Sequence, residues 1–272
     1  MRIGFRQIGV IAAKEFWDRI RNRWVFAVAA VFTAFALAIA YFGAAQQGEI
    51  GFKGIDVTIA SLVSLVIYLV PLIALILGFD AIVGERERGS LDLLLSMPMT
   101  RLELLLGKFA GLSAALAFST LAGFGLVGLL LSYQLDLGGL YHYFEFTLSA
   151  ILMGMAFLSI AILISVAAAD RARASGLAIA VWFFFVLVYD LVLLGMLVGS
   201  GGRIGSGIFP ILLLLNPADV FRIFNIFGMA EVKTLYGLAT VFPPTLAEPW
   251  LLGSVMVLWI GVPLAVATWR FK

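Results

Sequence analysis

The chain has 272 residues, of which 63% are hydrophobic and only 12% are charged. Soluble domains contain about 45 to 50% apolar residues, so this composition excludes an ordinary soluble protein and predicts that the chain lies in a lipid bilayer. The chain has no cysteine and a single histidine. Disulfides, thiolate metal sites, cysteine nucleophiles and a metal cage of several histidines within one chain are therefore excluded.

Residues 1–23 form a leader that is too polar to cross a membrane. Its apolar side chains recur at helical spacing, at Phe5, Ile8, Ala12, Phe16 and Ile20. Charged side chains recur on the opposite arc, at Arg6, Lys14, Asp18 and Arg21. This pattern predicts an amphipathic helix that lies in the membrane surface, although Arg19 falls on its apolar arc. A simple basic anchor that orients the first span is the alternative.

Six apolar windows follow, each about 20 residues long, which is the length that crosses the hydrocarbon core as a helix. They are residues 24–45, 57–79, 109–131, 146–167, 176–198 and 251–268. The windows lack the alternation of a transmembrane barrel, and helices satisfy their own backbone hydrogen bonds in lipid. The predicted fold class is therefore all-α, a polytopic integral membrane protein with six transmembrane helices. Because Glu15 and Asp18 lie in the leader, we expect the first window to be a retained span and not a secretory signal.

Lysine and arginine are distributed unequally between the two sides of this predicted membrane protein. If the N-terminus is inside, the outer segments hold only four of the 18 basic residues, Lys53, Arg203, Arg222 and Lys233. The positive-inside rule therefore predicts that both termini are cytoplasmic. Because topology accounts for the basic residues and the net charge is only +2, nucleic-acid binding is not expected.

The loop between the second and third windows, residues 80–108, interrupts the apolar chain with a charged, proline-broken stretch. Its charged run is Glu85, Arg86, Glu87 and Arg88. Gly89 and Ser90 end this run, and Ser90 is the expected N-cap of a short helix with Asp92 in its first turn. Pro98 is expected to end that helix, because the residue before a proline avoids the α region.

A second helix start follows at Thr100 and Glu103, which have the spacing of a capping box ahead of the third window. The short helix between the two breaks, predicted at residues 91–96, carries a leucine face made of Leu91, Leu94 and Leu95. We expect a partner to hold this helix on the cytoplasmic surface; leucines that simply dip into lipid are the alternative. The second inner loop, residues 168–175, is either a second contact or a charged turn. Its charged residues are Asp170, Arg171 and Arg173.

The third window contains a seam of small residues: Gly107, Gly111, Ala115, Gly123, Gly125 and Gly128. Small residues at such spacing let the backbones of membrane helices approach closely. We therefore expect this face of the third span to pack against neighbouring helices.

Residues 199–250 form the longest predicted outer segment. It begins with a glycine-rich linker, and its apolar run at residues 208–215 is too short to cross a membrane. Asn216 as N-cap, Pro217 at the first position and Asp219 in the first turn then predict a helix start. Apolar anchors follow at Val220, Phe221, Phe224 and Phe227. We expect a re-entrant or interfacial helix on the outer face, where a partner or a substrate exit would lie.

Asp190 is the one carboxylate deep within a predicted span. A charge at the centre of a transmembrane helix costs about 2.5 to 3.5 kcal/mol, so such a residue normally faces protein, water or a partner. Two roles remain open for Asp190. It is either a polar handle across a dimer interface, together with Tyr189, or part of a path for cations or protons.

The sequence offers no pattern for catalysis or a resident metal. It contains no GxxxxGK[ST] nucleotide loop, no HExxH and no GxSxG motif. Thioether sulfur suits Cu(I), but the methionines of this chain are no more numerous than membrane packing requires. They include Met97, Met99, Met153, Met155 and Met196. We therefore expect that the chain is not an enzyme and that it holds no metal or cofactor of its own.

Three segments resemble the permease subunits of ABC-2-type transporters: KEFWDRIRNRW (14–24), DAIVGERERGSLDLLLSMPMTRLELLLGK (80–108) and LLNPADVFRIFNI (214–226). The resemblance covers essentially the whole chain, which implies a single transmembrane domain over residues 1–272. Within this family, LGFDAIVGERE and NPADVFRIFN are most similar to the membrane subunits that serve assembly of the copper centre of nitrous oxide reductase.

The resemblance implies a complex in the bacterial inner membrane. Two copies of the chain would form its membrane part, two cytoplasmic ATPase subunits would bind ATP and Mg, and a periplasmic β-helical protein would lie on the outer face. Residues 1–23 would be an elbow helix, residues 84–97 a coupling helix in a cleft of the ATPase, and residues 170–175 a second contact. ATP hydrolysis would then drive transport, or mechanical work on the periplasmic protein.

The resemblance also implies which residues contact partners. Those that would contact the ATPase are Glu85, Arg86, Glu87, Arg88, Gly89, Ser90, Leu91, Leu94, Leu95, Pro98, Asp170, Arg171 and Arg173. Those that would contact the periplasmic protein are Asn216, Pro217, Asp219, Phe221 and Phe224. An exporter of a lipid, drug or saccharide and an ATPase-independent membrane scaffold are the alternative functions.

Overall fold

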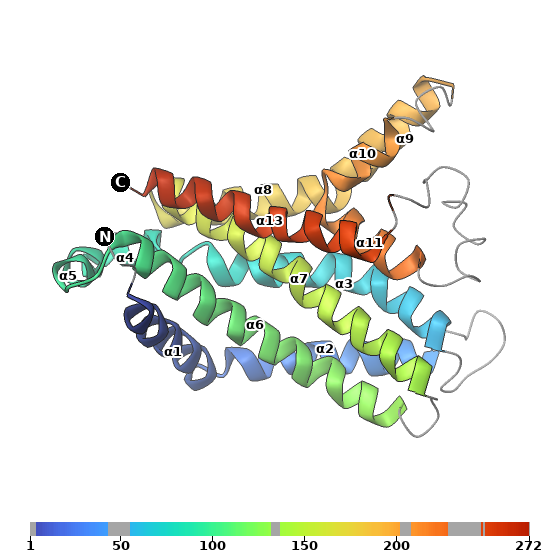
Figure 1. The fold of residues 1–272 in the computed structure, drawn as a ribbon, viewed down its shortest axis with the longest axis horizontal. Coiled ribbons are helices and arrows are strands. Elements are labelled where there is room, and N and C mark those ends of the chain that lie inside the picture. Colours follow the sequence, from blue (N-terminus) through green and yellow to red (C-terminus); the bar gives the residue numbers. More distant parts are fainter. Residues whose placement is uncertain are drawn as a thin grey trace.

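The computed structural model describes residues 4–42, 55–131, 137–201, 208–227, 246 and 248–271. Within these residues every regular element is a helix (Figure 1). The first half of the chain contains α1 (Phe5–Arg21), α2 (Trp24–Phe42), α3 (Ile55–Gly78), α4 (Val83–Glu87), α5 (Ser90–Ser96) and α6 (Arg101–Leu131). The second half contains α7 (Leu137–Ala167), α8 (Arg171–Phe183), the π-helix η2 (Phe184–Val188), α9 (Tyr189–Gly199), α10 (Phe209–Leu214), α11 (Pro217–Phe227) and α13 (Pro249–Arg270).

Within the described residues, the helices account for five of the six predicted spans, and for the first span only when the bent pair α1 and α2 is counted as one. Five segments are long and apolar enough to cross a membrane: Ile59–Glu87, Arg101–Leu129, Gly138–Ala167, Arg171–Gly199 and Pro249–Arg270. The pair α1 and α2, bent by 64°, passes the same test when its two helices are taken together. The prediction of an all-α polytopic membrane protein is therefore confirmed. Of the predicted outer segment, residues 199–250, the stretches 202–207 and 228–245 and residue 247 lie outside the described residues.

α7 is the central helix of the bundle. It packs against α3, α6, α11 and α13, and 67% of its apolar window is buried, against 17% for the run α8–η2–α9. Aromatic rings fill the space around it, with Phe124 of α6 at 5.5 Å and Phe221 of α11 at 6.0 Å from the ring of Phe146. The fifth span, which consists of α8, η2 and α9, therefore lies at the edge of the bundle.

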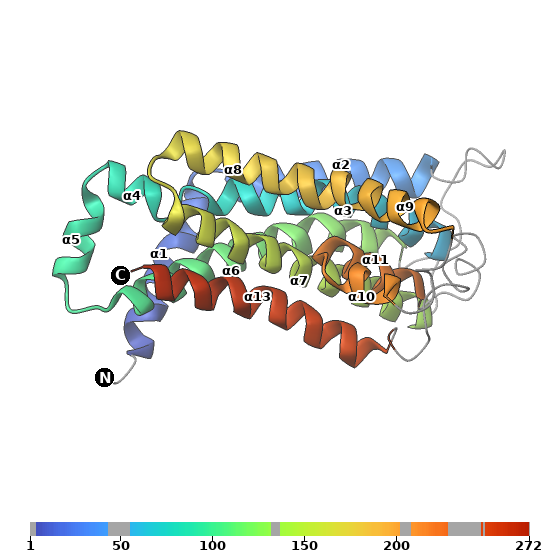
Figure 2. The same cartoon turned by 90° about the horizontal axis from the view of Figure 1, so that it is seen from above.

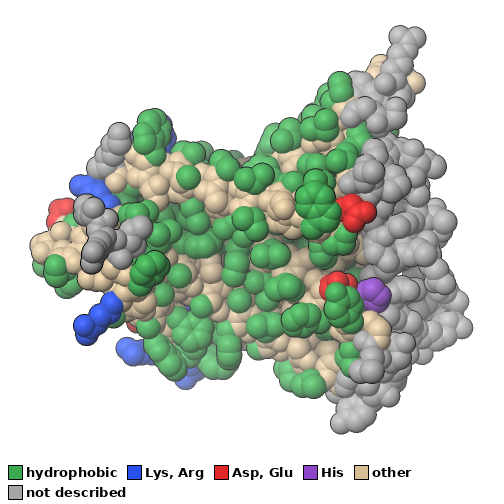
Figure 3. Space-filling model, viewed as in Figure 1, with side chains coloured by type: hydrophobic (Ala, Val, Ile, Leu, Met, Phe, Trp, Pro, Cys, Tyr) green, Lys and Arg blue, Asp and Glu red, His purple; other side chains and the backbone are tan. Residues whose placement is uncertain are grey.

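Charged side chains lie mainly toward the two ends of the bundle on the face shown in Figure 3, with a hydrophobic belt between them. α4 and α5 project beyond one end, which is called the α5 end below, and the opposite end is called the far end. Both chain termini lie at the α5 end in two perpendicular views (Figures 1 and 2). Both ends of the chain thus lie at one end of the bundle, as six spans would require.

α1 packs along α6, and this contact corrects the predicted amphipathic pattern. Its buried residues are Ile11 and Glu15, whereas Phe5, on the predicted apolar arc, is 83% exposed. The buried face includes an acid because α6 supplies a cationic partner for Glu15, described below.

Glycines of α6 make room for α1 and α2, as the small-residue seam predicts. A Cβ atom at Gly111 would lie 2.5 Å from the backbone oxygen of Ala12, and one at Gly107 would lie 2.6 Å from Cβ of Ile11. Gly123 meets α2 equally closely. Atoms do not pack at such distances, so α1 and α2 can lie this close to α6 only while these positions lack side chains.

We expect Gly111→Ala to lower the free energy of unfolding by about 1 to 3 kcal/mol, because the added methyl group overlaps the backbone of α1. Gly125→Ala is the matched control, since a Cβ atom there meets nothing within 4 Å and alanine favours the helix. Thermal unfolding of the purified chain in detergent checks both variants. Equal melting temperatures would contradict the packing argument.

Candidate functional site

A serine from another helix caps the start of α4. The backbone N–H groups of Ile82 and Val83 donate to Ser165 Oγ at 2.9 and 3.0 Å. Ser165 belongs to α7 and is completely buried. The first N–H groups of a helix have no partner within that helix. Ser165 therefore stabilises the start of α4 and ties it to the central helix.

Gly89 forms the corner between α4 and α5. Its φ of 70° lies in the left-handed region, which glycine adopts without steric cost. α5 starts at Ser90, but the prediction that Ser90 caps it is wrong, because its hydroxyl donates to the Glu85 carboxylate instead. Met97 is extended, with φ −74° and ψ 159°, so α5 ends where Pro98 predicts.

The predicted capping box at the start of α6 is present. The Thr100 N–H donates to Glu103 Oε2 at 2.7 Å, and the Glu103 N–H donates to Thr100 Oγ1 at 3.2 Å. Glu103 Oε1 also accepts from the backbone N–H of Gly4 at 2.6 Å, a contact that the sequence pattern does not indicate. Glu103 thus holds the starts of α6 and α1 together.

The two loops predicted to contact an ATPase are bonded to each other. Arg86 Nη1 donates to the carbonyl of Ala168 at 2.9 Å, at the end of α7, where the helix dipole favours a cation. Glu87 Oε1 accepts from the backbone N–H of Arg171 at 2.8 Å. The Arg171 guanidinium makes a two-point contact with Asp80, at 2.6 and 3.0 Å. These hydrogen bonds and this ion pair therefore hold the loop after α3 against the start of α8.

Asp170 is the N-cap of α8. Its Oδ1 accepts from the N–H of Arg173 at 2.8 Å, and its Oδ2 pairs with Arg173 Nε at 3.1 Å. The side chains are 41% and 73% exposed, so this ion pair contributes only about 0 to 1 kcal/mol. Asp170 and Arg173 thus have a capping role, and their expected contact with an ATPase stays a prediction.

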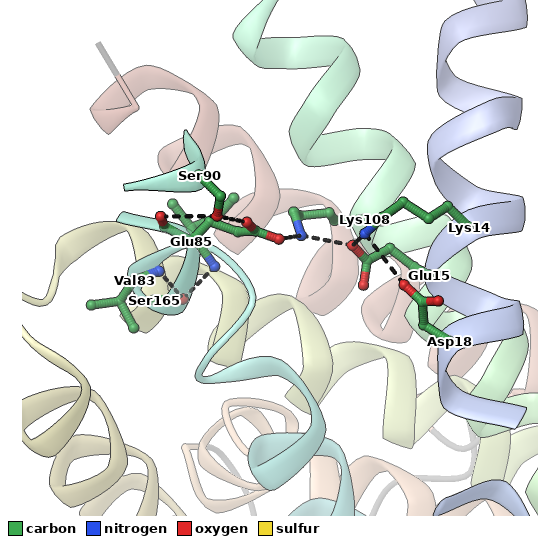
Figure 4. Close-up of polar contacts among 9 residues, drawn as sticks. Lys14, Glu15, Asp18, Val83, Glu85, Ser90, Lys108 and Ser165 are labelled. Carbon is green, nitrogen blue, oxygen red and sulfur yellow. Dashed lines mark hydrogen bonds and ion pairs between the residues drawn. The ribbon is translucent and has the colours of Figure 1, made fainter. Parts of the chain in front are cut away.

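A buried lysine joins α6 to both α1 and α4 (Figure 4). Lys108 Nζ donates to Glu15 Oε1 at 2.7 Å and to Glu85 Oε1 at 3.2 Å. The exposed fractions of these three side chains are 3% for Lys108, 9% for Glu15 and 12% for Glu85. Buried charges are tolerated only while they remain paired and hydrogen-bonded. The Glu15–Lys108–Glu85 cluster therefore requires α1, α4 and α6 to keep their relative positions.

A polar cavity of about 280 Å³ opens beside this cluster. It is lined by Lys14, Glu15, Asp18, Arg19, Asn22, Asp80, Ala81, Glu85, Arg88 and Lys108. Acidic and basic side chains are equal in number, so the cavity does not favour a ligand of either charge. Lys14 Nζ lies 3.3 Å from Asp18 and 3.6 Å from Glu15, and it continues the chain of ion pairs toward the solvent.

The leucine face of α5 packs against the bundle, whereas the sequence analysis expected it to contact a partner. Leu91 is buried, and Leu94 and Leu95 are half-buried against the core. The three share one helix face at i, i+3 and i+4 spacing, and burying that face removes the most apolar surface from water. The exposed apolar side chains are Leu93, at 69%, and Met97, at 52%. The expectation that Leu91 is open to a partner is wrong, and Leu93 and Met97 were missed.

The residues predicted to contact an outer partner face into the bundle. Four of them are buried, namely Asn216, Pro217, Asp219 and Phe221, and Phe224 is partly buried. The predicted helix start is present, because Asn216 Oδ1 accepts from the N–H of Ala218 at 3.0 Å. α11 packs against α3, α7 and α13, so the bundle covers its apolar face. This corrects the expectation, since buried side chains are not available to an outer partner.

Asp190 faces another helix of the same chain. Its Oδ2 lies 2.8 Å from Nη2 of Arg222 on α11, and Arg222 Nη1 lies 2.6 Å from Asp219 Oδ1. The adjacent Tyr189 hydroxyl donates to the carbonyl of Leu212 at 2.7 Å. The partner of Asp190 is thus an arginine that the sequence analysis counted only as an outer charge, and neither predicted role is needed to explain its place in the membrane.

Comparison with known proteins identifies the family. Residues 10–272 match the family model described as ABC-2 family transporter protein. The chain belongs to the ABC-2 transporter family. It is 44% identical to the "Probable ABC transporter permease protein NosY" of Stutzerimonas stutzeri, over 98% of both chains. It is 43% identical to the protein of that name in Pseudomonas aeruginosa, over 97% of this chain and 98% of the relative.

Sequence reasoning missed three residues at the α5 end of this ABC-2 permease: Glu15, Lys108 and Ser165. Two of them carried a signal, because Glu15 is an acid in a basic leader and Lys108 is a base directly before an apolar window. Opposite charges at the ends of two neighbouring helices favour a pairing. Ser165 carried no such signal, because a serine in a span is common and its N–H partners come from a distant segment.

In this ABC-2 permease we expect Lys108→Met to lower the free energy of unfolding by about 3 to 5 kcal/mol, because it removes the buried cation that Glu85 and Glu15 share and leaves Glu15 with only the exposed Lys14. Lys14→Met is the control, since Lys14 is 55% exposed and its loss is expected to cost about 1 kcal/mol or less. Thermal unfolding in lipid nanodiscs measures both. If the two variants melt at one temperature, the buried cluster does not stabilise the α5 end.

Proposed function

We propose that this permease converts ATP hydrolysis by a separate cytoplasmic ATPase subunit (NosF-like) into movement of its membrane helices. The observation that carries the proposal is the arrangement of the α5 end. α5 projects beyond the spans, and its Leu93 and Met97 are exposed. The preceding helix, α4, is bonded to several other helices. A short helix with an exposed apolar edge at such a place fits a groove in a partner protein.

Three connections would pass a displacement of α5 to the spans. Ser165 of α7 accepts a hydrogen bond from the backbone at the start of α4, and Arg86 of α4 donates to the carbonyl of Ala168, just after α7. Glu87 holds the start of α8. Glu85 acts through Lys108 on α6 and α1. Because it is costly to remove one partner from a buried ion pair, these helices would follow α4 and would not separate from it.

In this proposal the α5 end lies in the cytoplasm of a bacterial inner-membrane protein, so both termini are cytoplasmic. The concentration of lysine and arginine in the predicted inner segments supports this orientation. ATP and Mg would bind to the ATPase subunits. Two copies of this chain, surrounded by membrane lipid, would form the membrane part, with a periplasmic β-helix protein (NosD-like) at the far end.

The process served is assembly of the copper centre of nitrous oxide reductase, through transport or through mechanical work on the periplasmic partner. This part of the proposal is supported by the similarity to two relatives named NosY and by the family segments of the sequence. It does not rest on a metal site. In the part of the chain that the structure describes, no group of three or more His, Asp or Glu side chains could hold a metal ion.

We expect Leu93→Asp to reduce co-purification of the ATPase subunit with the tagged permease by at least about tenfold. A carboxylate buried in the interface would weaken the binding free energy by at least about 1.4 kcal/mol, which corresponds to that factor. Leu93→Met is the matched control and should retain the ATPase. Leu94 and Leu95 are poorer choices, since they also pack against the core. Equal recovery with both variants would place the contact elsewhere, and an unmodified chain that recovers no ATPase would favour the scaffold alternative.

A second experiment separates copper-centre assembly from general export. In a denitrifying bacterium that lacks its own NosY, we expect this chain, expressed with its ATPase and periplasmic partner, to restore the copper content and the visible absorption spectrum of nitrous oxide reductase. Lys108→Met, which disturbs the α5 end, should restore less at equal membrane abundance. A reductase that acquires its copper equally well without the chain would favour an exporter of another substrate.

A further inference from the structure

The α9 half of the fifth span is weakly held by packing. The π-helix η2 separates it from α8, and such interruptions often mark functional positions. The buried residue of α9 is Leu193, whereas Leu191 and Val198 are 67% and 72% exposed. Within the described residues α9 has no extensive contact with a helix other than η2, and Figure 1 shows it leading away from α13. Whatever holds α9 to the bundle must therefore be local.

Polar contacts to α10 and α11 supply that attachment. Asp190 pairs with Arg222 at 2.8 Å, and the Tyr189 hydroxyl donates to the Leu212 carbonyl at 2.7 Å. Asn216 Nδ2 donates to the carbonyl of Phe185 within η2 at 2.9 Å. Of these contacts, the one between Asp190 and Arg222 is an ion pair, so its strength depends on the charges around it.

A second carboxylate competes for the same guanidinium. Asp219 is completely buried, and its Oδ1 lies 2.6 Å from Arg222 Nη1. Burial raises the pKa of the Asp219 carboxyl to about 7, against the attraction of Arg222 and with a contribution from the nearby Asp190. Near neutral pH the group Asp190, Arg222 and Asp219 therefore has one proton to lose, and its net charge changes from zero to minus one.

Among the residues that the structure describes, few other ionisable groups face this cluster. Tyr68 of α3 acts on Arg222, and Tyr189 of α9 is close to both carboxylates. α10 has no ionisable residue, and the ionisable residue of α13, Arg270, lies in the last turn of that helix, at the α5 end. On α7, Phe146 contacts Phe221 and Ser149 bonds to Asn225 of α11, and neither of these α7 side chains titrates.

We propose that Asp190, Arg222 and Asp219 form a proton-binding latch that holds the α9 half of the fifth span on α11 and loosens when its proton is lost. With the proton bound, the neutral Asp219 carboxyl can donate to Asp190, and Arg222 serves a single carboxylate. When the proton passes to solvent, two carboxylates share one guanidinium in a medium of low dielectric and repel each other. Asp190 is the one that moves, because α9 has little packing to resist.

The sign of the pH dependence follows from linkage. The latched form holds the proton more tightly than an open form, because Asp190, which raises the pKa of the Asp219 carboxyl, lies beside that carboxyl only in the latched form. Latching is therefore favoured at low pH and weakens as the pH rises through about 7. The closing equilibrium constant falls by up to about tenfold between pH 6 and pH 8.5 for a pKa of about 7. The latch does not depend on the proposed ATPase contact, since its residues all lie beyond η2.

Hydrogen exchange by mass spectrometry tests the latch on the full chain in lipid nanodiscs, without nucleotide or partner. After correction for the intrinsic effect of pH, we expect amides of Tyr189–Gly199 to exchange faster at pH 8.5 than at pH 6, by up to about tenfold. Amides of Arg171–Phe183 should show no such change. Equal corrected rates for Tyr189–Gly199 at the two pH values would overturn the proposal.

Three variants identify the proton site. Asp219→Asn imitates the protonated carboxyl, so exchange in α9 should be slow at both pH values. Asp190→Asn removes the ion pair, so exchange should be fast at both, and Asp190→Glu should restore the pH dependence at least in part. Exchange in α8 reports whether each variant is folded. A pH dependence that survives Asp219→Asn would assign the proton to another group and refute the latch.

Discussion

One buried ammonium group between two carboxylates, Lys108 with Glu15 and Glu85, is the interaction on which the α5 end depends. The three side chains come from α6, α1 and α4, and each stabilises the charge of its partner in this buried setting. Helix starts at this end also depend on other helices. Ser165 of α7 accepts from the backbone at the start of α4, and Glu103 accepts from the backbone at the starts of both α6 and α1. The starts of α1, α4 and α8 each bond to a side chain from another helix, which makes this end rigid except for the exposed edge of α5.

The far end also places one cation between two carboxylates, but there the ion pairs hold a loosely packed helix. Arg222 lies between Asp190 and Asp219 as Lys108 lies between two glutamates. At the α5 end the ion pairs join helices that are already packed, as α1 is along α6. At the far end they hold a helix with little packing of its own, so a change of one charge can alter its position. A permease that receives movement at one end would benefit from stiff connections there and an adjustable helix at the other.

Much of the local structure could be predicted because its causes are local. The apolar windows, the capping box at Thr100, the stop before Pro98 and the helix start at Asn216 depend on residues within a few positions of one another. Predictions about exposure failed where an apolar face could point either into the bundle or away from it. The leucines of α5 and the aromatic residues of α11 mark an apolar face, but a periodicity does not say whether protein, lipid or a partner covers that face.

The sequence by itself determined that this chain is an all-α membrane protein with several spans and charged ends, because the lack of water in lipid requires helical backbone wherever apolar runs are long. It also determined most helix boundaries. Only the tertiary structure decided which charges meet. Glu15 pairs with Lys108, and Asp190 with Arg222, across separations of 93 and 32 residues, and such pairs form because helix packing removes both partners from water at one place.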